Sequence, residues 1–195
     1  MANSCFTEYI IRGNEQDIKT LHDTIVKLDN NPAPFVPNSW GNLSAGCLVA
    51  KLGGSCNDIY CRGQITSYEL NKNGKELYLC TESAWSELDE VRAFLTQKFP
   101  SLKFIFASEE SGCSYYVTND VECEFFGHYK LETIGVEHCS DEQHYCNSSE
   151  EVFEELKTIT GLEFSSIEEA QEYIEDFNRE DESKQITLSV FDIVT

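Results

Sequence analysis

The order of apolar and polar residues predicts a β-strand and then an amphipathic helix at the start of the chain. Residues 4–12 alternate, with Cys5, Tyr9 and Ile11 on one face at a period of two. Asn14 is a suitable N-cap for a helix that follows the strand. The helix should bury a stripe of apolar residues at helical spacing. These residues are Ile18, Leu21, Ile25 and Leu28.

Residues 30–52 predict a rigid connection and then a short helix. Three prolines between residues 30 and 38 exclude a helix from the connection. The short helix is expected within residues 40–52, before the glycine pair at residues 53–54. Its apolar residues would be Leu43, Cys47 and Leu48.

A β-hairpin is expected over residues 59–82. The pair Asn73-Gly74 favours a two-residue type I′ turn between its strands. Such a turn pairs Tyr68 with Leu79 and Leu70 with Leu77, which places four apolar side chains on one face of the hairpin.

A helix over residues 84–99 and a strand over residues 102–108 should follow the hairpin. The apolar stripe of this helix contains Trp85, Leu88, Val91, Leu95 and Phe99, and Pro100 stops it. The resulting order β-α-β-β-α-β predicts a ferredoxin-like core, in which two helices cover one face of an antiparallel sheet.

The rest of the chain predicts additional strands and two acidic helices. The strands are expected at 113–118, 122–134, 136–146 and 185–194, and the helices at 149–160 and 166–179. Ser166 and Glu169 form a capping-box pattern. The predicted fold class is therefore α+β, a ferredoxin-like core extended by extra strands and a C-terminal segment of two helices and a strand. We assign residues 1–134 to the core domain and residues 135–195 to an acidic helical extension packed on it.

Composition predicts a folded protein in a reducing compartment. Apolar residues form 41% of the 195 positions, with 12 Phe, 9 Tyr and 2 Trp. No run of about 18 apolar residues occurs, and the start lacks a basic, then apolar, leader. The nine cysteines are an odd number, and Cys5, Cys47 and Cys80 lie in apolar stretches. A cytoplasmic protein that does not enter the membrane is expected.

Acidic residues dominate the charge of the chain. Its formal net charge is −21, with only 14 Lys and Arg. Direct nucleic-acid binding is not expected, because binding to phosphates requires clustered cations. Residues 137–183 contain 16 acidic residues against Lys157 and Arg179, and so hold 14 of the 21 excess negative charges.

Several short segments between residues 4 and 134 resemble one known family. They are the first strand with Gly13, the stretch from Trp40-Gly41 to Gly53, Cys61-Arg62-Gly63, Ser83-Ala84-Trp85, Phe99-Pro100, and Glu109-Glu110 with Gly112. In these segments the chain resembles YubB-type ferredoxin-like proteins of plasmids, phages and integrated mobile elements. The resemblance implies the ferredoxin-like fold and a mobile-element context. The family has no settled biochemical activity, so the resemblance assigns no catalytic residue.

Two groups of residues are candidates for metal binding or acid-base chemistry. An extended segment would place His138, His144 and Cys146 on one face, although their spacing differs from that of zinc ribbons. A polar hairpin is the preferred interpretation, and no metal or cofactor is expected. Four acids are expected near strand ends, where carboxylates can converge as acid-base pairs or hard-metal ligands. They are Glu82, Glu109, Glu110 and Asp120. A solvated turn before Gly112 is the alternative for Glu109 and Glu110.

Arg62 and Trp85 are candidates for a ligand or peptide pocket, because an arginine beside an aromatic residue often makes specific contacts. The alternative for Trp85 is packing of its helix against the sheet. A Cys-His nucleophilic pair cannot be recognised from sequence, because such a pair forms only in space.

The sequence favours a non-enzymatic interaction module that presents an acidic face to a basic protein partner. Nucleotide-binding motifs of the G-x-x-x-x-G-K-[ST] and G-x-G-x-x-G types are absent, as is the H-E-x-x-H motif of zinc proteases. Two alternatives remain. One is a small cytoplasmic enzyme with a carboxylate- or Cys-based site, and the other is a nucleic-acid mimic that inhibits a host DNA-binding enzyme.

Overall fold

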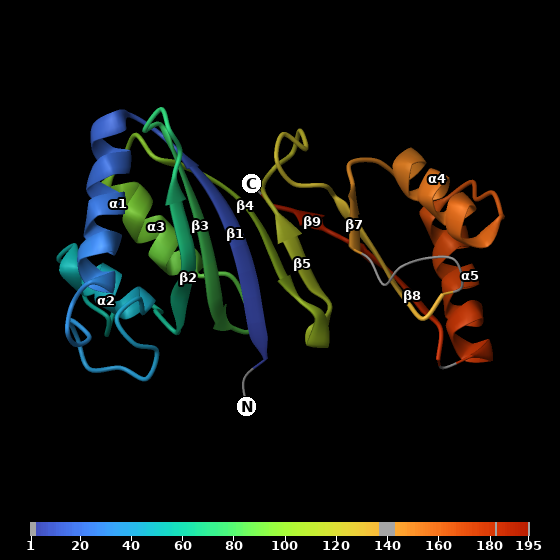
Figure 1. The fold of residues 1–195 in the computed structure, drawn as a ribbon, viewed down its shortest axis with the longest axis horizontal. Helices are drawn as coiled ribbons and strands as arrows, with labels where there is room; N and C mark the ends of the chain where they lie inside the picture. The colour runs from blue at the N-terminus through green and yellow to red at the C-terminus, as the bar shows by residue number, and fades with distance from the viewer. Residues whose placement is uncertain (1–2, 137–142, 182, 195) are drawn as a thin grey trace. The chain divides into compact units, whose positions relative to one another are not determined.

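A computed structural model describes residues 3–136, 143–181 and 183–194. It is an α+β structure with five α-helices and two sheets whose strands are mostly antiparallel (Figure 1). The chain divides into two compact units, Met1–Tyr115 and Tyr116–Thr195. Among the residues that the structure describes, no helix has the length and apolar character needed to cross a membrane.

Four strands of the first unit lie side by side, and each pair of neighbours is antiparallel. In spatial order they are β2 (Gly63–Leu70), β3 (Glu76–Ala84), β1 (Ser4–Arg12) and β4 (Lys103–Glu110). The alternation predicted for β1 is confirmed, because Cys5, Tyr9 and Ile11 are buried. Phe6 and Glu8 lie on the opposite face and are exposed. The buried face of these strands therefore forms the floor of the core.

Three helices cover that face of the sheet (Figure 1). They are α1 (Glu15–Asp29), α2 (Ala45–Lys51) and α3 (Asp89–Lys98). The predicted cap of α1 is confirmed, since the Asn14 side chain accepts a hydrogen bond from the Asp17 amide at 2.8 Å. The predicted stripe of α1 is fully buried: Ile18, Leu21, Ile25 and Leu28. The Ser44 hydroxyl caps α2 by accepting from the Cys47 amide at 3.1 Å.

The hairpin between β2 and β3 has the predicted register but a different turn. Leu70 lies opposite Leu77, as expected. The loop contains four residues, because the Asn71 amide donates to the Glu76 carbonyl at 2.9 Å. The Asn71 side chain organises this loop by accepting from the amides of Lys75 and Glu76. The loop therefore needs a positive φ only at Gly74, and the predicted type I′ turn is wrong.

The helix predicted over residues 84–99 begins five residues later, at Asp89. Pairing with β1 continues to Ala84, which lies opposite Ser4. Trp85 follows this pair in a left-handed conformation, with φ 74°, and its residue surface is 48% exposed. The prediction that Trp85 begins the buried helical stripe is therefore wrong. Long-range strand pairing outweighed the local helical pattern. The rest of the stripe, from Leu88 to Phe99, is buried as expected.

The second unit places two helices on one face of a three-stranded antiparallel sheet (Figure 1). The strands, in spatial order, are β7 (Gln143–Cys146), β6 (Tyr129–Ile134) and β8 (Gln185–Val190), and the helices are α4 (Ser149–Thr160) and α5 (Ile167–Glu180). Two short strands, β5 (Tyr115–Thr118) and β9 (Asp192–Ile193), form a parallel pair. The sequence prediction placed the division between the parts of the chain after residue 134, whereas β6 pairs along its whole length with β8.

The core of the second unit comes from both layers. Leu131 and Ile186 of the sheet contact Val152 and Leu156 of α4 and Ile174 of α5. The expected serine cap of α5 is present, since Ser166 accepts from the Glu169 amide. Ser148 caps α4 in the same way by accepting from the Glu151 amide, a cap that the sequence analysis did not predict. The strand predicted over residues 122–134 is wrong in its first half. That part is a loop, because its amides bond to one buried side chain, described below.

We expect Gly63→Ala to destabilise the first unit. A Cβ atom at this position would lie 2.6 Å from the Glu82 carbonyl oxygen and 2.8 Å from the Ser83 Cβ, so β2 and β3 would have to separate. The expected loss in free energy of unfolding is about 1–3 kcal/mol. It can be measured by urea denaturation with the fluorescence of Trp40 and Trp85, which both belong to this unit. Thr66→Ala, at an exposed position of the same strand, should change stability by less than about 0.5 kcal/mol. Equal stability of Gly63→Ala and the parent chain would contradict the close approach of the strands.

Candidate functional site

An open pocket of about 560 Å³ lies in the first unit. Its walls come from the proline-rich connection at residues 36–40, the start of α2, the loop at residues 56–62 that leads into β2, and Glu90 of α3. Both connections flank α2, which Figure 1 shows in teal. The volume is within the range of about 300–1,000 Å³ that is typical of small-molecule sites.

Hydrogen bonds hold the two walls of the pocket in place. In the proline-rich wall, the Asn38 side chain accepts from the Trp40 amide at 2.7 Å and donates to the Val36 carbonyl at 2.8 Å. In the other wall, the Tyr60 amide donates to a Glu90 carboxylate oxygen at 2.6 Å. The Cys56 thiol donates to the carbonyl of Gly46 in α2. The proline-rich connection is thus held by bonds within itself, and the loop at residues 56–62 is held by bonds to α2 and α3. The pocket is therefore largely formed before any ligand binds.

Arg62 lines this pocket and is exposed. The other three arginines of the chain each form an ion pair with a carboxylate: Arg12 with Glu76, Arg92 with Glu87 and Arg179 with Asp176. Within the described parts of the chain, the guanidinium of Arg62 has no such partner. An arginine without a carboxylate is unusual in a chain that contains 35 acidic residues and 14 basic ones.

The aromatic residues of the pocket are Trp40 and Tyr60, and Trp85 does not line it. Of the two residues that the sequence suggested for a ligand pocket, Arg62 therefore lines the pocket and Trp85 does not. Ligand binding by Arg62 stays a prediction. The sequence analysis did not name Trp40 or Tyr60 as pocket residues, because both lie in irregular connections where no hydrophobic period indicates which way a side chain points.

The four predicted carboxylates do not gather at one point. Glu82 and Glu109 both lie opposite Phe6, one on each side of it, on the face that the three helices leave uncovered. Glu82 accepts hydrogen bonds from the side chains of Ser4 and Gln64 at 2.8 and 3.1 Å. Two strand spacings separate these acids, or about 10 Å, which is too far for a shared proton.

Glu110 lies on the opposite face and is buried. Its carboxylate caps the 3₁₀ turn Ser111–Cys113, accepting from the amides of Gly112 and Cys113 at 2.8 Å each and from the Cys113 thiol. The bond from the Cys113 thiol, and then the bonds from these amides, lower the pKa of Glu110. Glu110 therefore has a structural role as a turn cap.

Asp120, in the second unit, organises the loop that replaces the predicted strand. Its buried carboxylate accepts from the amides of Glu124, Phe125 and Phe126 at 3.1, 2.6 and 2.9 Å. The His128 ring bonds its backbone carbonyl at 2.7 Å. These bonds satisfy amides that would otherwise have to pair in a sheet.

The structure describes two of the three candidate metal ligands, since His138 lies outside the described residues. His144 and Cys146 share one face of β7, opposite Leu131 and Tyr129 respectively. Cys146 is buried in the apolar core of the second unit. Within residues 3–136, 143–181 and 183–194, no three His, Cys, Asp or Glu side chains are grouped as metal ligands.

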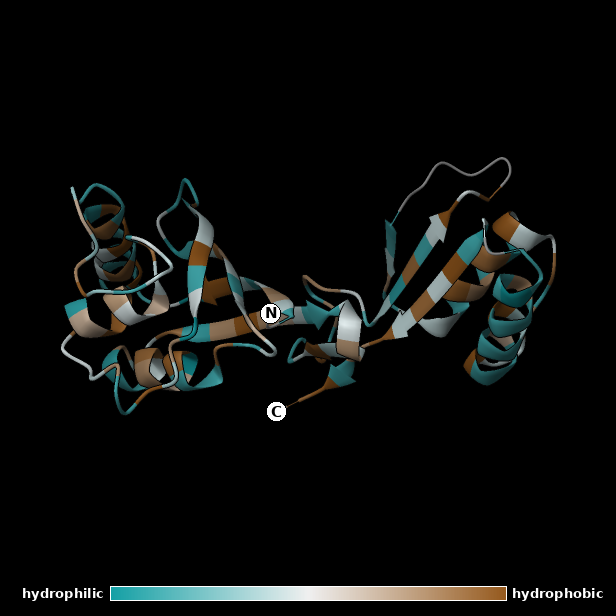
Figure 2. Ribbon diagram, turned by 90° about the horizontal axis from the view of Figure 1, so that it is seen from below, coloured by the Kyte–Doolittle hydropathy of each residue, from teal (hydrophilic) through white to brown (hydrophobic). Residues whose placement is uncertain are grey.

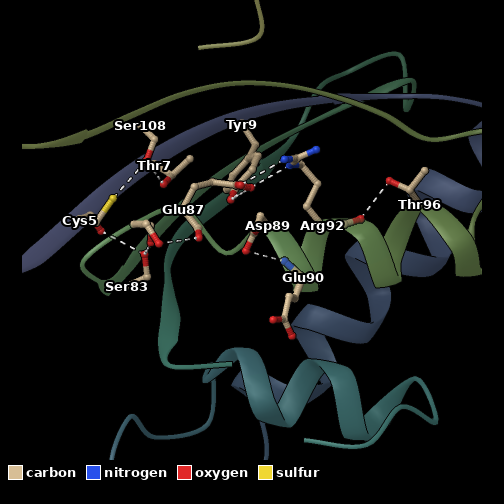
Figure 3. A network of polar contacts seen from close by, with 11 residues as sticks. Cys5, Thr7, Tyr9, Ser83, Glu87, Asp89, Glu90, Arg92, Thr96 and Ser108 are labelled. Carbon is tan, nitrogen blue, oxygen red and sulfur yellow. Dashed lines mark hydrogen bonds and ion pairs between the residues drawn. The ribbon is translucent and has the colours of Figure 1, made fainter. Parts of the chain in front are cut away.

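A buried ion pair in the first unit was not visible from the sequence (Figure 3). Glu87, only 3% exposed, accepts from the Tyr9 hydroxyl at 2.8 Å and from two guanidinium nitrogens of Arg92 at 2.8 and 3.2 Å. Burial and the Glu87 charge raise the pKa of Tyr9 well above its ordinary value. The Arg92 guanidinium also lies over the Phe106 ring, 4.8 Å from its centroid. This network joins β1, the turn before α3 and α3 itself.

A second buried polar cluster lies nearer the N-terminal end of β1 (Figure 3). The hydroxyls of Thr7 and Ser108 are 2.8 Å apart, and the Cys5 sulfur is 3.1 Å from the Ser108 hydroxyl. Burial is the main cause of the raised pKa of the Cys5 thiol. These groups satisfy one another inside the core, and a raised pKa is the opposite of what a thiolate nucleophile requires.

Further thiols with a raised pKa include Cys61, Cys113 and Cys146. Burial is also the main cause that raises the pKa of Cys61 to about 11 and of Cys146 to about 11. The hydrogen bond to Glu110 raises the pKa of Cys113. All eight cysteines that the structure describes are free thiols.

The second unit carries most of the charge of the protein. It contains 21 of the 35 acidic residues but only four basic residues, which gives a formal charge of −17. α5 exposes six of these acids: Glu168, Glu169, Glu172, Glu175, Asp176 and Glu180. The two cations of the helices are neutralised, since Lys157 pairs with Glu163 and Arg179 pairs with Asp176. Figure 2 shows the predominantly hydrophilic (teal) character of α5.

Comparisons of the chain with protein-family models, with curated proteins and with solved structures find no match. The YubB-type resemblance therefore stays a prediction from the sequence.

We expect Arg92→Leu to destabilise the protein much more than Arg179→Leu. The first change leaves the buried Glu87 carboxylate without its cation and should cost about 3–5 kcal/mol of unfolding free energy. The second breaks an ion pair whose side chains are each 72% exposed and should cost less than about 1 kcal/mol. Urea denaturation measures both. The double variant Glu87→Leu with Arg92→Leu should regain part of the loss, because no buried charge remains. Similar losses for the two single variants would contradict a structural role for the Glu87 network.

We expect Cys61 to react slowly with iodoacetamide at pH 8. With a pKa of about 11, only about one thiol in a thousand is ionised at this pH, and the thiolate is the reactive form. Its alkylation, followed by peptide mass spectrometry, should be at least about tenfold slower than that of glutathione and should accelerate as the pH rises toward 11. Alkylation as fast as that of glutathione would indicate an activated thiol and would revive a cysteine-based enzyme.

Proposed function

We propose that this protein is a non-enzymatic interaction module whose second unit presents an acidic helical surface to a basic protein partner. The observation that supports this most is the separation of charge between the units. A formal charge of −17 belongs to the second unit and −4 to the first, which contains the other 14 acidic and 10 basic residues.

The way α4 and α5 fold makes this charge available. Each helix buries its apolar side in the core of its own unit, at Val152 and Leu156 in one helix and at Ala170 and Ile174 in the other. The acidic side chains of α5 consequently remain in solvent, without an unpaired cation among them. A surface of one sign attracts partners of the opposite sign over distances of about a Debye length and accelerates their association. The same surface repels the phosphates of nucleic acids.

The strand order supports a finer proposal about the fold. We infer that the first unit is ferredoxin-like, with α2 as an additional helix. The order β2-β3-β1-β4 with antiparallel neighbours and helices on one face fits this architecture. Together with the sequence segments named above, it favours the YubB-type family and a mobile-element protein. The free thiols favour a reducing compartment such as the cytoplasm.

The enzymatic alternative has less support. The carboxylates expected to converge lie on opposite faces of β4 or far apart on one face, and the thiols whose pKa is shifted have it raised. General acid-base or nucleophilic chemistry requires such groups to lie within hydrogen-bond reach of one another.

The proposal predicts that removing three charges from α5 will weaken partner binding. The full-length chain serves as bait in lysate of the cells that express it, at about 50 mM and about 500 mM salt, and a retained basic protein is identified and purified. The variant Glu168→Gln, Glu172→Gln, Glu175→Gln should bind this protein about tenfold more weakly at low salt. None of these three side chains caps a helix or forms an ion pair that the structure describes.

A matched control removes three exposed acids from the first unit instead: Glu8→Gln, Glu15→Gln and Glu69→Gln. This control should bind within about twofold of the parent chain, because its net charge changes equally but the α5 surface is intact. Equal losses for the two variants, or no retained basic protein at low salt, would contradict the proposal. Displacement of the retained protein by duplex DNA would instead favour a nucleic-acid mimic.

A further inference from the structure

We propose that the pocket of the first unit binds a small aromatic monocarboxylate, with the carboxylate on Arg62 and the ring against Trp40 and Tyr60. This site is separate from the acidic surface of the second unit. The proposal goes beyond the interaction function and does not depend on it.

The first reason for this proposal is that Arg62 is available to bind an anion. Its guanidinium lines the pocket, is exposed, and has no carboxylate partner within the part of the chain that the structure describes. A guanidinium presents parallel N–H donors that match the two oxygens of a carboxylate, and the resulting bidentate pair is directional as well as strong. An external carboxylate can therefore take the place that an Asp or Glu occupies beside each of the other three arginines.

The aromatic lining is the second reason. Trp40 and Tyr60 come from the two opposite connections of the pocket, and Tyr60 is 40% exposed. Val36 and Ile59 add apolar surface beside them. Aromatic rings bind a planar apolar group by burying its surface, with additional stabilisation from offset or edge-to-face contacts. A ligand that carries only a charge would leave this surface unused.

The acids of the pocket restrict the charge of the ligand. Asp58 and Glu90 line the same pocket as Arg62, and Glu90 is held in place by its bond from the Tyr60 amide. Figure 3 shows the Glu90 side chain directed away from the Glu87 network and toward α2. Asp58 and Glu90 outnumber Arg62, the one cation in the lining, so a monocarboxylate can bind only through a direct ion pair with the guanidinium. A dianionic phosphate would add a second negative charge that no lining cation compensates, and would be repelled more strongly. The overall charge of −21 adds to this repulsion.

The first experiment compares the affinity of the pocket for three phenyl compounds that differ in charge. The probes are 3-phenylpropionate, its neutral analogue 3-phenylpropanamide, and the dianion phenyl phosphate. Binding is followed by tryptophan fluorescence in Trp85→Phe, which leaves Trp40 in the pocket wall as the only indole. Calorimetry on the unaltered chain repeats the titrations, so the result does not depend on that variant. We expect saturable binding of 3-phenylpropionate and at least about tenfold weaker binding of both comparators.

The second experiment tests the role of Arg62. Arg62→Gln should weaken the binding of 3-phenylpropionate at least about tenfold, and Arg62→Lys should weaken it less, because a point charge remains without the bidentate geometry. Neither change removes a hydrogen bond or ion pair that the structure describes. The matched control is Arg179→Gln, an exposed arginine of the second unit, which should leave binding unchanged. Tyr60→Ala should also weaken binding, through loss of ring contact.

Several results would overturn the proposal. These are no saturation by 3-phenylpropionate at about 10 mM, equal affinity for the amide, tighter binding of phenyl phosphate, or an Arg62→Gln variant that binds like the parent chain. The α5 variant described above should bind 3-phenylpropionate normally. Failure of this proposal is therefore distinguishable from failure of the interaction function.

Discussion

The antiparallel pairing of β1 with two neighbours is the interaction on which the first unit depends. β1 pairs with β3 from Ser4 to Arg12 and with β4 from Phe6 to Arg12. The two strands it joins are far from it in sequence, so this one strand brings together residues from three parts of the chain. The same pairing decides where β3 ends and α3 can begin. It also aligns Tyr9 with the turn that carries Glu87, and hence with Arg92.

A sheet covered by helices on one face has two different surfaces, and this difference explains the fate of the predicted carboxylates. Neighbouring residues on a strand alternate between faces, so Glu109 lies on the uncovered face while Glu110 is buried and caps a turn. The covered face instead concentrates the apolar core, with the hydrogen-bonded Glu87 network buried in it. The pocket forms outside both faces, where the connections around α2 meet the beginning of α3. Irregular backbone held by a rigid scaffold is where binding residues are commonly found.

The two units differ in how they use charge. In the first, 14 acids stand against 10 bases, and Arg62 is unusual because no carboxylate of the described residues forms an ion pair with it. In the second, acids outnumber bases about fivefold, and the basic residues of the helices are already paired. The first arrangement suits recognition of one small anion, and the second suits attraction of a large cationic surface. A single chain can thus combine two binding properties that depend on opposite local electrostatics.

Local patterns determined much of the architecture. The alternation of β1, the cap and stripe of α1, the hairpin register and the two acidic helices follow from periodicity and capping, which involve residues close in sequence. Composition likewise determined the charge of the C-terminal region. The sequence also singled out Arg62 as a candidate, and the structure places it in the wall of a pocket.

Only the tertiary structure decided the rest. The first turn predicted for α3 was lost to pairing with β1, and the first half of the strand predicted over residues 122–134 became a loop around Asp120. Trp40, Tyr60 and Glu90 met Arg62 at one pocket, although they lie in three separate segments of the chain. These outcomes depend on contacts between residues far apart in sequence. Such contacts are set by competition among pairings and by satisfaction of buried polar groups, which no local period records.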